Sequence, residues 1–144
     1  MKIESVLATK GTHVITVRPE QTLSEAVALL AEHDIGALVV VDGEGKPLGI
    51  ISERDIIREA AHTDDALARS VSQVMTGGVI TASPQDDLEA VLQTMSARHI
   101  RHLPIMDQQQ LAGIVSIRDV VKAQLDRYLG EVDTLETQIL EEHA

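Results

Sequence analysis

The stretch GIISERD, residues 49–55, recurs as GIVSIRD at residues 113–119. Each copy has a glycine and two aliphatic residues before Ser-x-x-Asp, a pattern typical of a strand that leads into the first turn of a helix. Further upstream, the tripeptide VIT at residues 14–16 recurs at residues 79–81. Since both pairs keep the same order and nearly the same separation, one structural unit is encoded twice.

Within each unit the hydrophobic pattern predicts the order β-α-β-β-α. Residues 37–41 are an unbroken aliphatic run, which favours a strand covered on both faces. The first helix of each unit is expected to open with a capping box, Thr22-x-x-Glu25 in the first unit and Asp86-x-x-Glu89 in the second. The elements expected in the first unit are a strand at 14–17, a helix from Thr22, strands at 37–41 and 48–51, and a helix at 52–61.

The duplication divides the chain into a first repeat at residues 1–62, a second at 63–125 that opens with a short linker at 63–70, and a C-terminal amphipathic helix at 126–144. Residues 76–78, Thr-Gly-Gly, are expected to form a loop. Neither repeat is long enough to cover its own sheet, so the two should pack against each other with approximate twofold symmetry. The predicted class is therefore α/β (α+β) with two tandem repeats and a terminal helix.

The C-terminal segment carries an apolar stripe whose members are spaced alternately by four and three residues. Such a stripe either pairs with a second copy of itself or packs on its own domain, and the sequence leaves both open. Gly130 is expected to interrupt it. The stripe consists of Val121, Leu125, Tyr128, Val132, Leu135 and Ile139.

Composition excludes several classes of function. The 144 residues hold 12 Lys+Arg against 23 Asp+Glu, a net charge of -11, and Tyr128 is the only aromatic residue, so nucleic acid is not an expected partner. No run approaches the ~20 apolar residues that span a membrane, and no signal segment is apparent. The chain has no cysteine, which suits a reducing compartment, and the expected location is the cytoplasm.

The duplicated Ser-x-x-Asp segments are the strongest candidates for chemistry. Free N–H groups and the helix dipole at such a terminus favour an anion such as phosphate, to which Ser52 and Ser116 can donate. Asp55 and Asp119 can each accept hydrogen bonds from the two hydroxyls of a ribose. The alternative is that both pairs are only capping boxes. Arg54 and Arg118 recur as well, and either neutralise phosphate or are solvated helix side chains.

A cluster of cations distinguishes the second repeat. Residues 98–102 read RHIRH where residues 33–37 of the first repeat read HDIGA, and Arg101 and His102 are therefore candidates for phosphate contacts. The two clefts are expected to be unequal. His99 and His102 lack an obvious third metal ligand, so no metal is expected. Walker, nucleophile-elbow and dinucleotide motifs are also missing from the sequence, which argues against an enzyme.

The chain resembles a CBS-domain pair, or Bateman module, of the stand-alone bacterial type over about residues 1–125. The features that carry the resemblance are the tandem order of elements, both Ser-x-Arg-Asp segments, VSQVMT at 71–76 and HLPIMD at 102–107. The resemblance implies clefts between the repeats that bind AMP, ADP, ATP, NAD or S-adenosylmethionine. It implies phosphate and ribose contacts at the two Ser-Asp pairs. It also implies an adenine border at Thr16, Thr81, Ala37, Leu38, His102, Leu103 and Pro104.

The expected function is therefore a nucleotide sensor without an attached effector domain. It would form a homodimer and act on a separate protein target. The alternatives are a dimeric interaction scaffold with a vestigial cleft, and a nucleotide-consuming enzyme.

Overall fold

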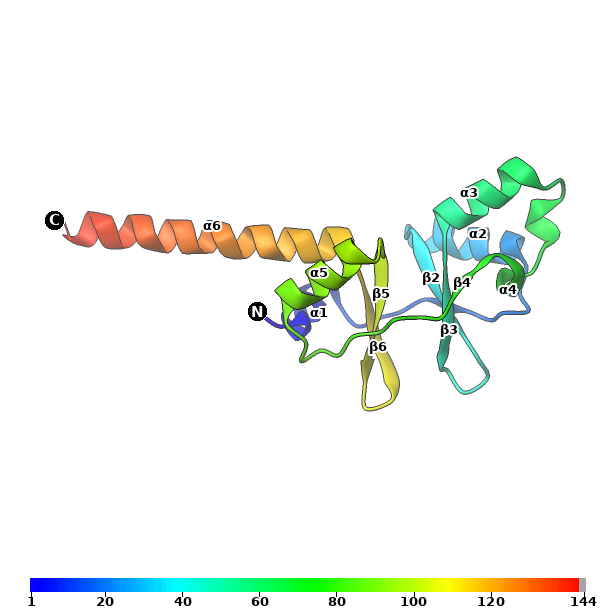
Figure 1. Ribbon diagram of the computed structural model, residues 1–144, viewed down its shortest axis with the longest axis horizontal. Helices are drawn as coiled ribbons and strands as arrows, with labels where there is room; N and C mark the ends of the chain where they lie inside the picture. Colours follow the sequence, from blue (N-terminus) through cyan, green and yellow to red (C-terminus); the bar gives the residue numbers. More distant parts are fainter. Residues whose placement is uncertain (143–144) are drawn as a thin grey trace.

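The computed structural model describes residues 1–142, which form two α/β units lying side by side (Figure 1). The first unit has the predicted β-α-β-β-α order: β1 (Thr16–Val17), α2 (Leu23–His33), β2 (Ala37–Val41), β3 (Pro47–Ser52) and α3 (Glu53–His62). The second contains α5 (Leu88–Ala97), β5 (His102–Asp107), β6 (Gln110–Ser116) and the start of α6 (Ile117–Glu142). The remaining elements are α1 (Ile3–Lys10), the 3-10 turn η1 (Ala66–Ala68), α4 (Val71–Val74) and β4 (Thr76–Gly77).

The first sheet has the order β1-β2-β3-β4, in which β1 and β2 are parallel and the other pairs antiparallel. Strand β4 corrects the prediction of a loop at residues 76–78, because Thr76 and Gly77 pair with Ile50 and Gly49. Gly49 permits this pairing: a Cβ there would lie 2.6 Å from the carbonyl oxygen of Thr76. Through this close approach, the segment that leads into the second repeat joins the sheet of the first unit.

The second unit has a reduced sheet, the hairpin of β5 and β6. The repeat predicts a strand at residues 79–81, to match the one at 14–17, and this prediction is wrong. Only Ala82 bridges to β5: its N–H donates to Pro104 O, and the N–H of Met106 donates to Ala82 O. Pro104 stands where the first repeat has Val39, and it has no N–H with which to extend a parallel ladder toward residue 80. This substitution accounts for the missing counterpart of β1 in the second sheet.

The helix that precedes each repeat packs on the other unit. The N–H of Ile3 in α1 donates to Asp86 O of the second unit at 3.0 Å, and the N–H of Val71 in α4 donates to Gln21 O of the first at 2.8 Å. Figure 1 accordingly shows α1 near α5, although the two helices are distant in the sequence. This exchange ties the two units together, although their apolar cores are separate.

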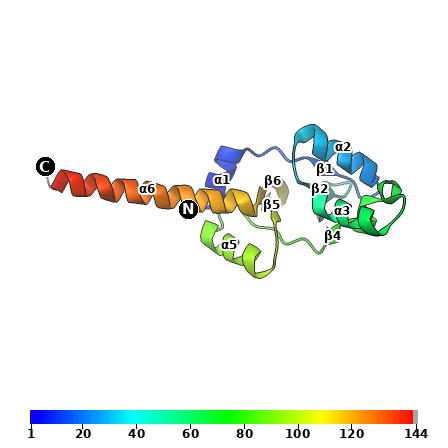
Figure 2. The same ribbon diagram turned by 90° about the horizontal axis from the view of Figure 1, so that it is seen from above.

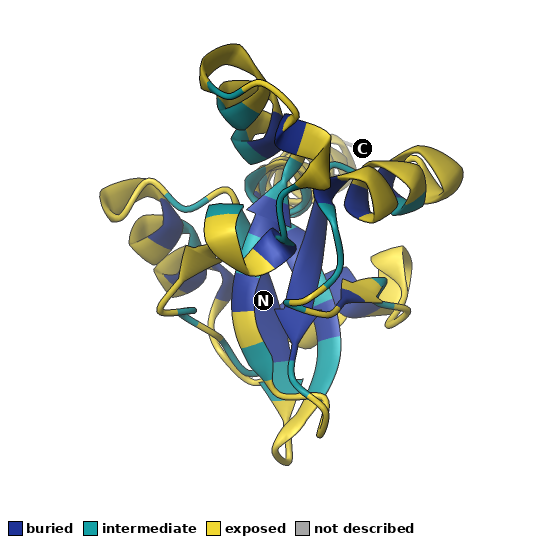
Figure 3. Ribbon diagram, turned by 90° about the vertical axis from the view of Figure 1, so that its right-hand side faces the viewer, coloured by how far each residue is buried: buried dark blue, intermediate teal, exposed yellow. Residues whose placement is uncertain are grey.

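Each unit has its own apolar core. One is formed by α1, α5, β5, β6 and α6, the other by β1, α2, β2, β3, α3 and α4, and among the described residues the two sets have no member in common. All five residues of β2 are buried, which confirms the expected burial on both faces. The buried strands form the centre of the view in Figure 3, with the helices exposed on the outside.

Two expectations about helix ends need correction. Helix α5 is capped by Asp87, whose side chain accepts from the N–H of Ala90, whereas Asp86 accepts from the N–H of Ser83. Gly130 does not end or interrupt α6, which continues to Glu142. The ion pair between Arg127 Nε and Glu131 Oε1 at 3.4 Å spans the glycine and supports the continuous helix.

Beyond the second unit, α6 extends as a free rod (Figures 1 and 2). Its apolar stripe is uncovered, with 48 to 58% of each side chain exposed from Val121 to Ile139. The alternative in which this helix packs on its own domain is therefore wrong for the described residues. A search of residues 1–142 finds no helix with the length and apolar character needed to cross a membrane.

Candidate functional site

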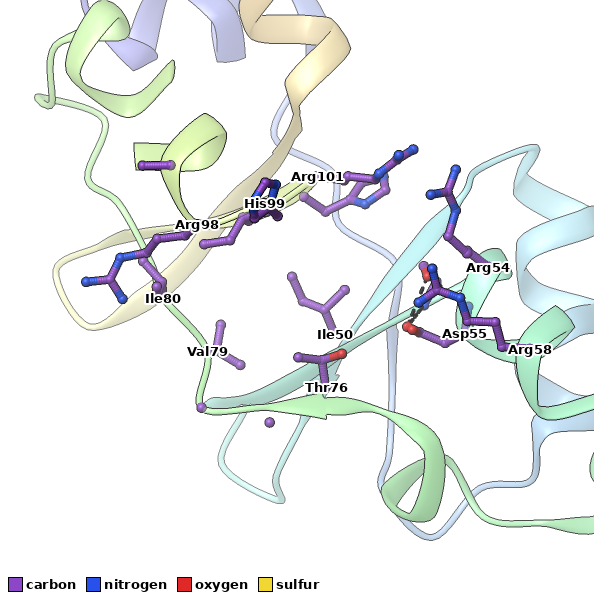
Figure 4. Close-up of a pocket in the computed structure, with 16 residues that line it drawn as sticks. Ile50, Arg54, Asp55, Arg58, Thr76, Val79, Ile80, Arg98, His99 and Arg101 are labelled. Carbon is purple, nitrogen blue, oxygen red and sulfur yellow. Dashed lines mark hydrogen bonds between the residues drawn. The ribbon is translucent and has the colours of Figure 1, made fainter. Parts of the chain in front are cut away.

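A cleft of about 820 Å³ lies between the two units, and both contribute to its walls (Figure 4). The first unit supplies the end of β3 and the start of α3, while the second supplies the end of α5 and the turn into β5. Strand β4 and the residues after it form the edge between them. The lining residues are Ile50, Ser52, Arg54, Asp55, Arg58, Thr76, Gly77, Gly78, Val79, Ile80, Ala97, Arg98, His99, Ile100, Arg101 and His102.

Ser52 and Asp55 form a complete capping box at the start of α3. Ser52 N–H and Oγ donate to Asp55 Oδ2 at 2.9 and 3.0 Å, and Asp55 N–H donates to Ser52 Oγ at 3.2 Å. The structure thus contains the capping interaction that the sequence left as an alternative. Asp55 Oδ1 takes no part in the box, so capping and ligand binding are compatible at this carboxylate.

The cleft concentrates positive charge in an acidic protein. Its described lining holds four arginines against one carboxylate, Asp55. Arg54 and Arg58 lie one turn apart on α3, and Arg101 faces them from the other unit, whereas the side chain of Arg98 lines the cleft but points away from α3 (Figure 4). Together with the N-terminus of α3, these positive charges make the cleft suited to an anionic ligand.

His102 lies half-buried at the start of β5, between the two units. Burial lowers the pKa of His102, and the positive charges of Lys10 and Arg101 act in the same direction, outweighing the opposing effects of Asp119 and Glu53. The imidazole is therefore neutral near pH 7 and able to donate or accept a hydrogen bond.

The equivalent Ser-Asp pair of the second unit has a different environment. Ser116 N–H donates to Asp119 Oδ2 at 2.8 Å, and Lys10 Nζ at the end of α1 donates to the same oxygen at 2.5 Å. Burial acts to raise the pKa of Asp119, but the hydrogen bond from Lys10, together with those from Ser116, outweighs it and holds the pKa below its usual range. This carboxylate is neutralised from within the chain.

The structure brings some of the sequence candidates together and separates others. Ser52, Arg54, Asp55, Arg101 and His102 line the cleft described above. The second set, Ser116, Arg118 and Asp119, lies at the start of α6 beside Lys10. The expected adenine border is more dispersed: Thr16, Ala37 and Pro104 lie in strands and Thr81 precedes the Ala82 bridge, while Leu38 and Leu103 are 0% and 2% exposed within the two cores.

Sequence reasoning missed Arg58, the cleft position of Arg98, and the segment at residues 76–80. Arg58 could have been found, because it follows Arg54 by four residues and therefore shares its helix face. The segment carried no comparable signal, since its position depends on pairing with β3. His99 and His102 both line the cleft, and within residues 1–142 no three metal-ligating side chains gather.

Comparison with known proteins gives a consistent family assignment. The sequence model described as CBS domain matches the chain twice, at residues 5–62 and 71–126. The CBS domain-containing protein YhcV of Bacillus subtilis is 39% identical over 124 residues, which cover 85% of this chain and 87% of YhcV.

Solved structures agree with this assignment. The CBS-domain containing protein ATU1752 of Agrobacterium tumefaciens superposes with a TM-score of 0.81 at 38% identity, covering 86% of this chain and 99% of that one. The CBS domain pair of protein MJ0100, in complex with 5′-methylthioadenosine and S-adenosyl-L-methionine, superposes with a TM-score of 0.78 at 27% identity, covering 88% of this chain and 98% of that one.

Proposed function

The chain belongs to the CBS-domain family, with two copies in tandem, and from that premise we propose that it is a regulatory module that binds an adenosyl nucleotide at Asp55. The observation that carries the proposal is the cleft between the units, where one carboxylate lies among four arginines. Its relative MJ0100 is known in complex with two adenosyl compounds, which supports the ligand class. The module would be cytoplasmic and act through binding, without catalysis of its own.

The residues of the cleft match the parts of such a ligand. Asp55 Oδ1 accepts from the ribose hydroxyls, and the N-terminus of α3 receives the first phosphate. Since the described lining has no aromatic side chain, the base packs between aliphatic residues and is recognised through backbone groups. The aliphatic side chains available for this are Ile50, Val79, Ile80 and Ile100.

The charge of the cleft favours ligands with several phosphates. AMP can satisfy the arginines of α3, whereas the more distal phosphates of ADP or ATP reach toward Arg101 on the opposite wall. A ligand of this kind links two units whose cores are separate. Occupancy would thus change their relative arrangement, which a separate protein target could detect.

A thermal-shift panel of AMP, ADP, ATP, NAD, NADH and S-adenosylmethionine tests the proposed function. A ligand at 100 times its Kd stabilises the folded state by ~2.7 kcal/mol, enough to raise Tm by several degrees in a domain of this size. We expect the largest shifts from ADP and ATP. No shift with any compound at millimolar concentration would leave the interaction scaffold as the function.

Binding of a polyphosphate is expected to strengthen as pH falls from 7.5 to 5.5 by a contribution from His102. The pKa of this half-buried imidazole is lowered in the free protein, chiefly by burial, and an adjacent phosphate would raise it, so binding takes up a proton. One proton accounts for at most a tenfold gain in affinity per pH unit. Calorimetry with ADP measures it.

The matched control is His102→Asn, measured over the same pH range. ADP has a titrating phosphate of its own, with a pKa of about 6, and its contribution to the pH dependence remains in the variant. Only the difference between the two proteins therefore reports on His102. Parallel pH profiles would exclude it as a phosphate contact.

We also propose that the chain forms a homodimer through α6, because its exposed apolar stripe needs a partner. The spacing of four and three residues is that of a two-stranded coiled coil, which a second copy of the same helix would match. The uncovered length of α6 supports this occupant over the protein's own units (Figure 2). The same observation favours the interaction scaffold as the second candidate function.

Sedimentation of the full chain and of Leu135→Glu tests the dimer. The leucine is 58% exposed, so the substitution should leave the fold intact while placing two carboxylates in the seam of the pair. We expect a dimer for the wild type and a monomer for the variant at micromolar concentration. Thr137→Glu, on the opposite face of the helix, should stay dimeric. A monomeric wild type would refute the proposal, and a dimeric Leu135→Glu would move the interface elsewhere.

A further inference from the structure

The two Ser-Asp pairs have the same local structure, which makes their surroundings directly comparable. Asp55 and Asp119 each accept from the backbone N–H of a serine three residues earlier, at 2.9 and 2.8 Å. Each follows a strand that contains a glycine three residues before the serine, Gly49 in β3 and Gly113 in β6. A difference in ligand binding between them must come from what faces them.

The helices that precede the repeats align through those glycines. A Cβ on Gly113 would lie 2.6 Å from Leu7 Cδ2, and one on Gly49 would lie 2.8 Å from Met75 Sδ, so Leu7 and Met75 are structural equivalents. From Leu7 the chain needs six residues to reach the first VIT tripeptide, whereas from Met75 it needs three to reach the second. The first connection is therefore longer by three residues.

Those additional residues form one more helical turn. Helix α1 runs on to Lys10, whereas α4 ends at Val74 and the chain then enters β4. The extra turn carries Lys10 onto Asp119, with Nζ at 2.5 Å from Oδ2. At the other site, β4 leaves Asp55 facing the cleft.

The second site lacks the cations that the opposite unit supplies to the first, although Arg118 and Lys122 match Arg54 and Arg58 on its own helix. The positions that correspond to Arg98, His99, Arg101 and His102 are His33, Asp34, Gly36 and Ala37. A polyphosphate is therefore poorly matched there, and Lys10 already supplies the one cation that the carboxylate needs.

We infer that Lys10 determines which of the two sites is used: its ion pair with Asp119 closes that site, so each chain binds one adenosyl ligand, at Asp55. This inference rests on the proposed function of the Asp55 cleft. Lys10 donates to Oδ2, the oxygen that also accepts from the N–H of Ser116, and so neutralises this carboxylate from within the chain. Its removal would open a second site suited to an adenosyl compound without phosphate.

Calorimetry of the wild type and of Lys10→Met tests the inference. Methionine keeps the length and the helix-forming tendency of lysine but removes its charge. We expect both proteins to bind one ADP per chain. With ADP saturating, 5′-methylthioadenosine should then bind to Lys10→Met at one further equivalent per chain and not to the wild type. The control Lys122→Met removes the same charge one turn after Asp119 and should behave as the wild type.

A second measurement reports on the ion pair without any ligand. The pKa of Asp119, followed by NMR of its carboxyl carbon, should rise in Lys10→Met, because burial continues to raise it while the opposing lysine is gone. Failure of the wild type to bind ADP at all would overturn the proposed function and the inference with it. Two ligands bound per wild-type chain, or a Lys10→Met that binds only ADP although its Asp119 pKa has risen, would overturn the inference alone.

Discussion

Asp55→Asn is expected to lower the affinity for an adenosyl nucleotide by roughly 10- to 150-fold, the equivalent of a lost charge-assisted hydrogen bond worth about 1.5–3 kcal/mol. The capping box determines which atom of the asparagine side chain faces the ribose. Ser52 N–H and Oγ both donate to Oδ2, so Asn would keep its carbonyl oxygen there and turn its NH₂ group toward the ribose. A donor would then face the hydroxyls that Asp55 accepts. Calorimetry with AMP and ADP measures the loss.

Stability and ligand chemistry provide the controls for this experiment. The substitution keeps the acceptor of the cap and should lower the free energy of unfolding by at most ~1 kcal/mol. A 2′-deoxy ligand removes the same hydrogen bond from the other side and should lose little further affinity in the variant. Asp119→Asn alters the equivalent cap, and since Lys10 occupies that carboxylate, ligand affinity should not change. Undiminished affinity in Asp55→Asn would reduce the motif to helix capping.

The fold was predictable wherever one repeat determines its own structure. Strand β2 is marked by five consecutive aliphatic residues, and α3 by the Ser52 and Asp55 capping pair, so both follow from local sequence. Strand β4 and the exchange of α1 and α4 depend on contacts between distant segments. The pairing of Thr76 with Ile50 requires Gly49 to lack a side chain, which periodicity does not reveal.

The candidate site was predictable to the same extent. The duplicated motif identified Ser52 and Asp55, and the comparison of repeats identified Arg101 and His102 as the point of difference. It could not say which aspartate these cations accompany, because that depends on how the units face each other. The structure puts them in the cleft of Asp55. The role of Lys10 was hidden, since three additional residues become meaningful only once they form a helical turn.

Arg101→Ala is expected to lower the affinity for ATP by roughly 10- to 150-fold and the affinity for AMP by much less. Arg101 faces α3 from the opposite wall of the cleft, where distal phosphates extend, whereas the N-terminus of α3 and Arg54 attract the first phosphate (Figure 4). Loss of this guanidinium should thus reduce the preference for ATP over AMP, while AMP still binds nearly as well as to the wild type. Calorimetry with both nucleotides measures the ratio of their Kd values.

The ionic strength offers an independent measure of the same contact. Between 50 and 300 mM salt, wild-type affinity for ATP should fall more steeply than that for AMP, because screening grows with the charge neutralised in the complex. The two slopes should converge in Arg101→Ala. Arg118→Ala removes an arginine from the equivalent place at the start of α6, beside the ion pair of Lys10 and Asp119, and should change neither affinity nor slope. Equal losses of ATP and AMP binding in Arg101→Ala would mean that this arginine does not distinguish phosphate number.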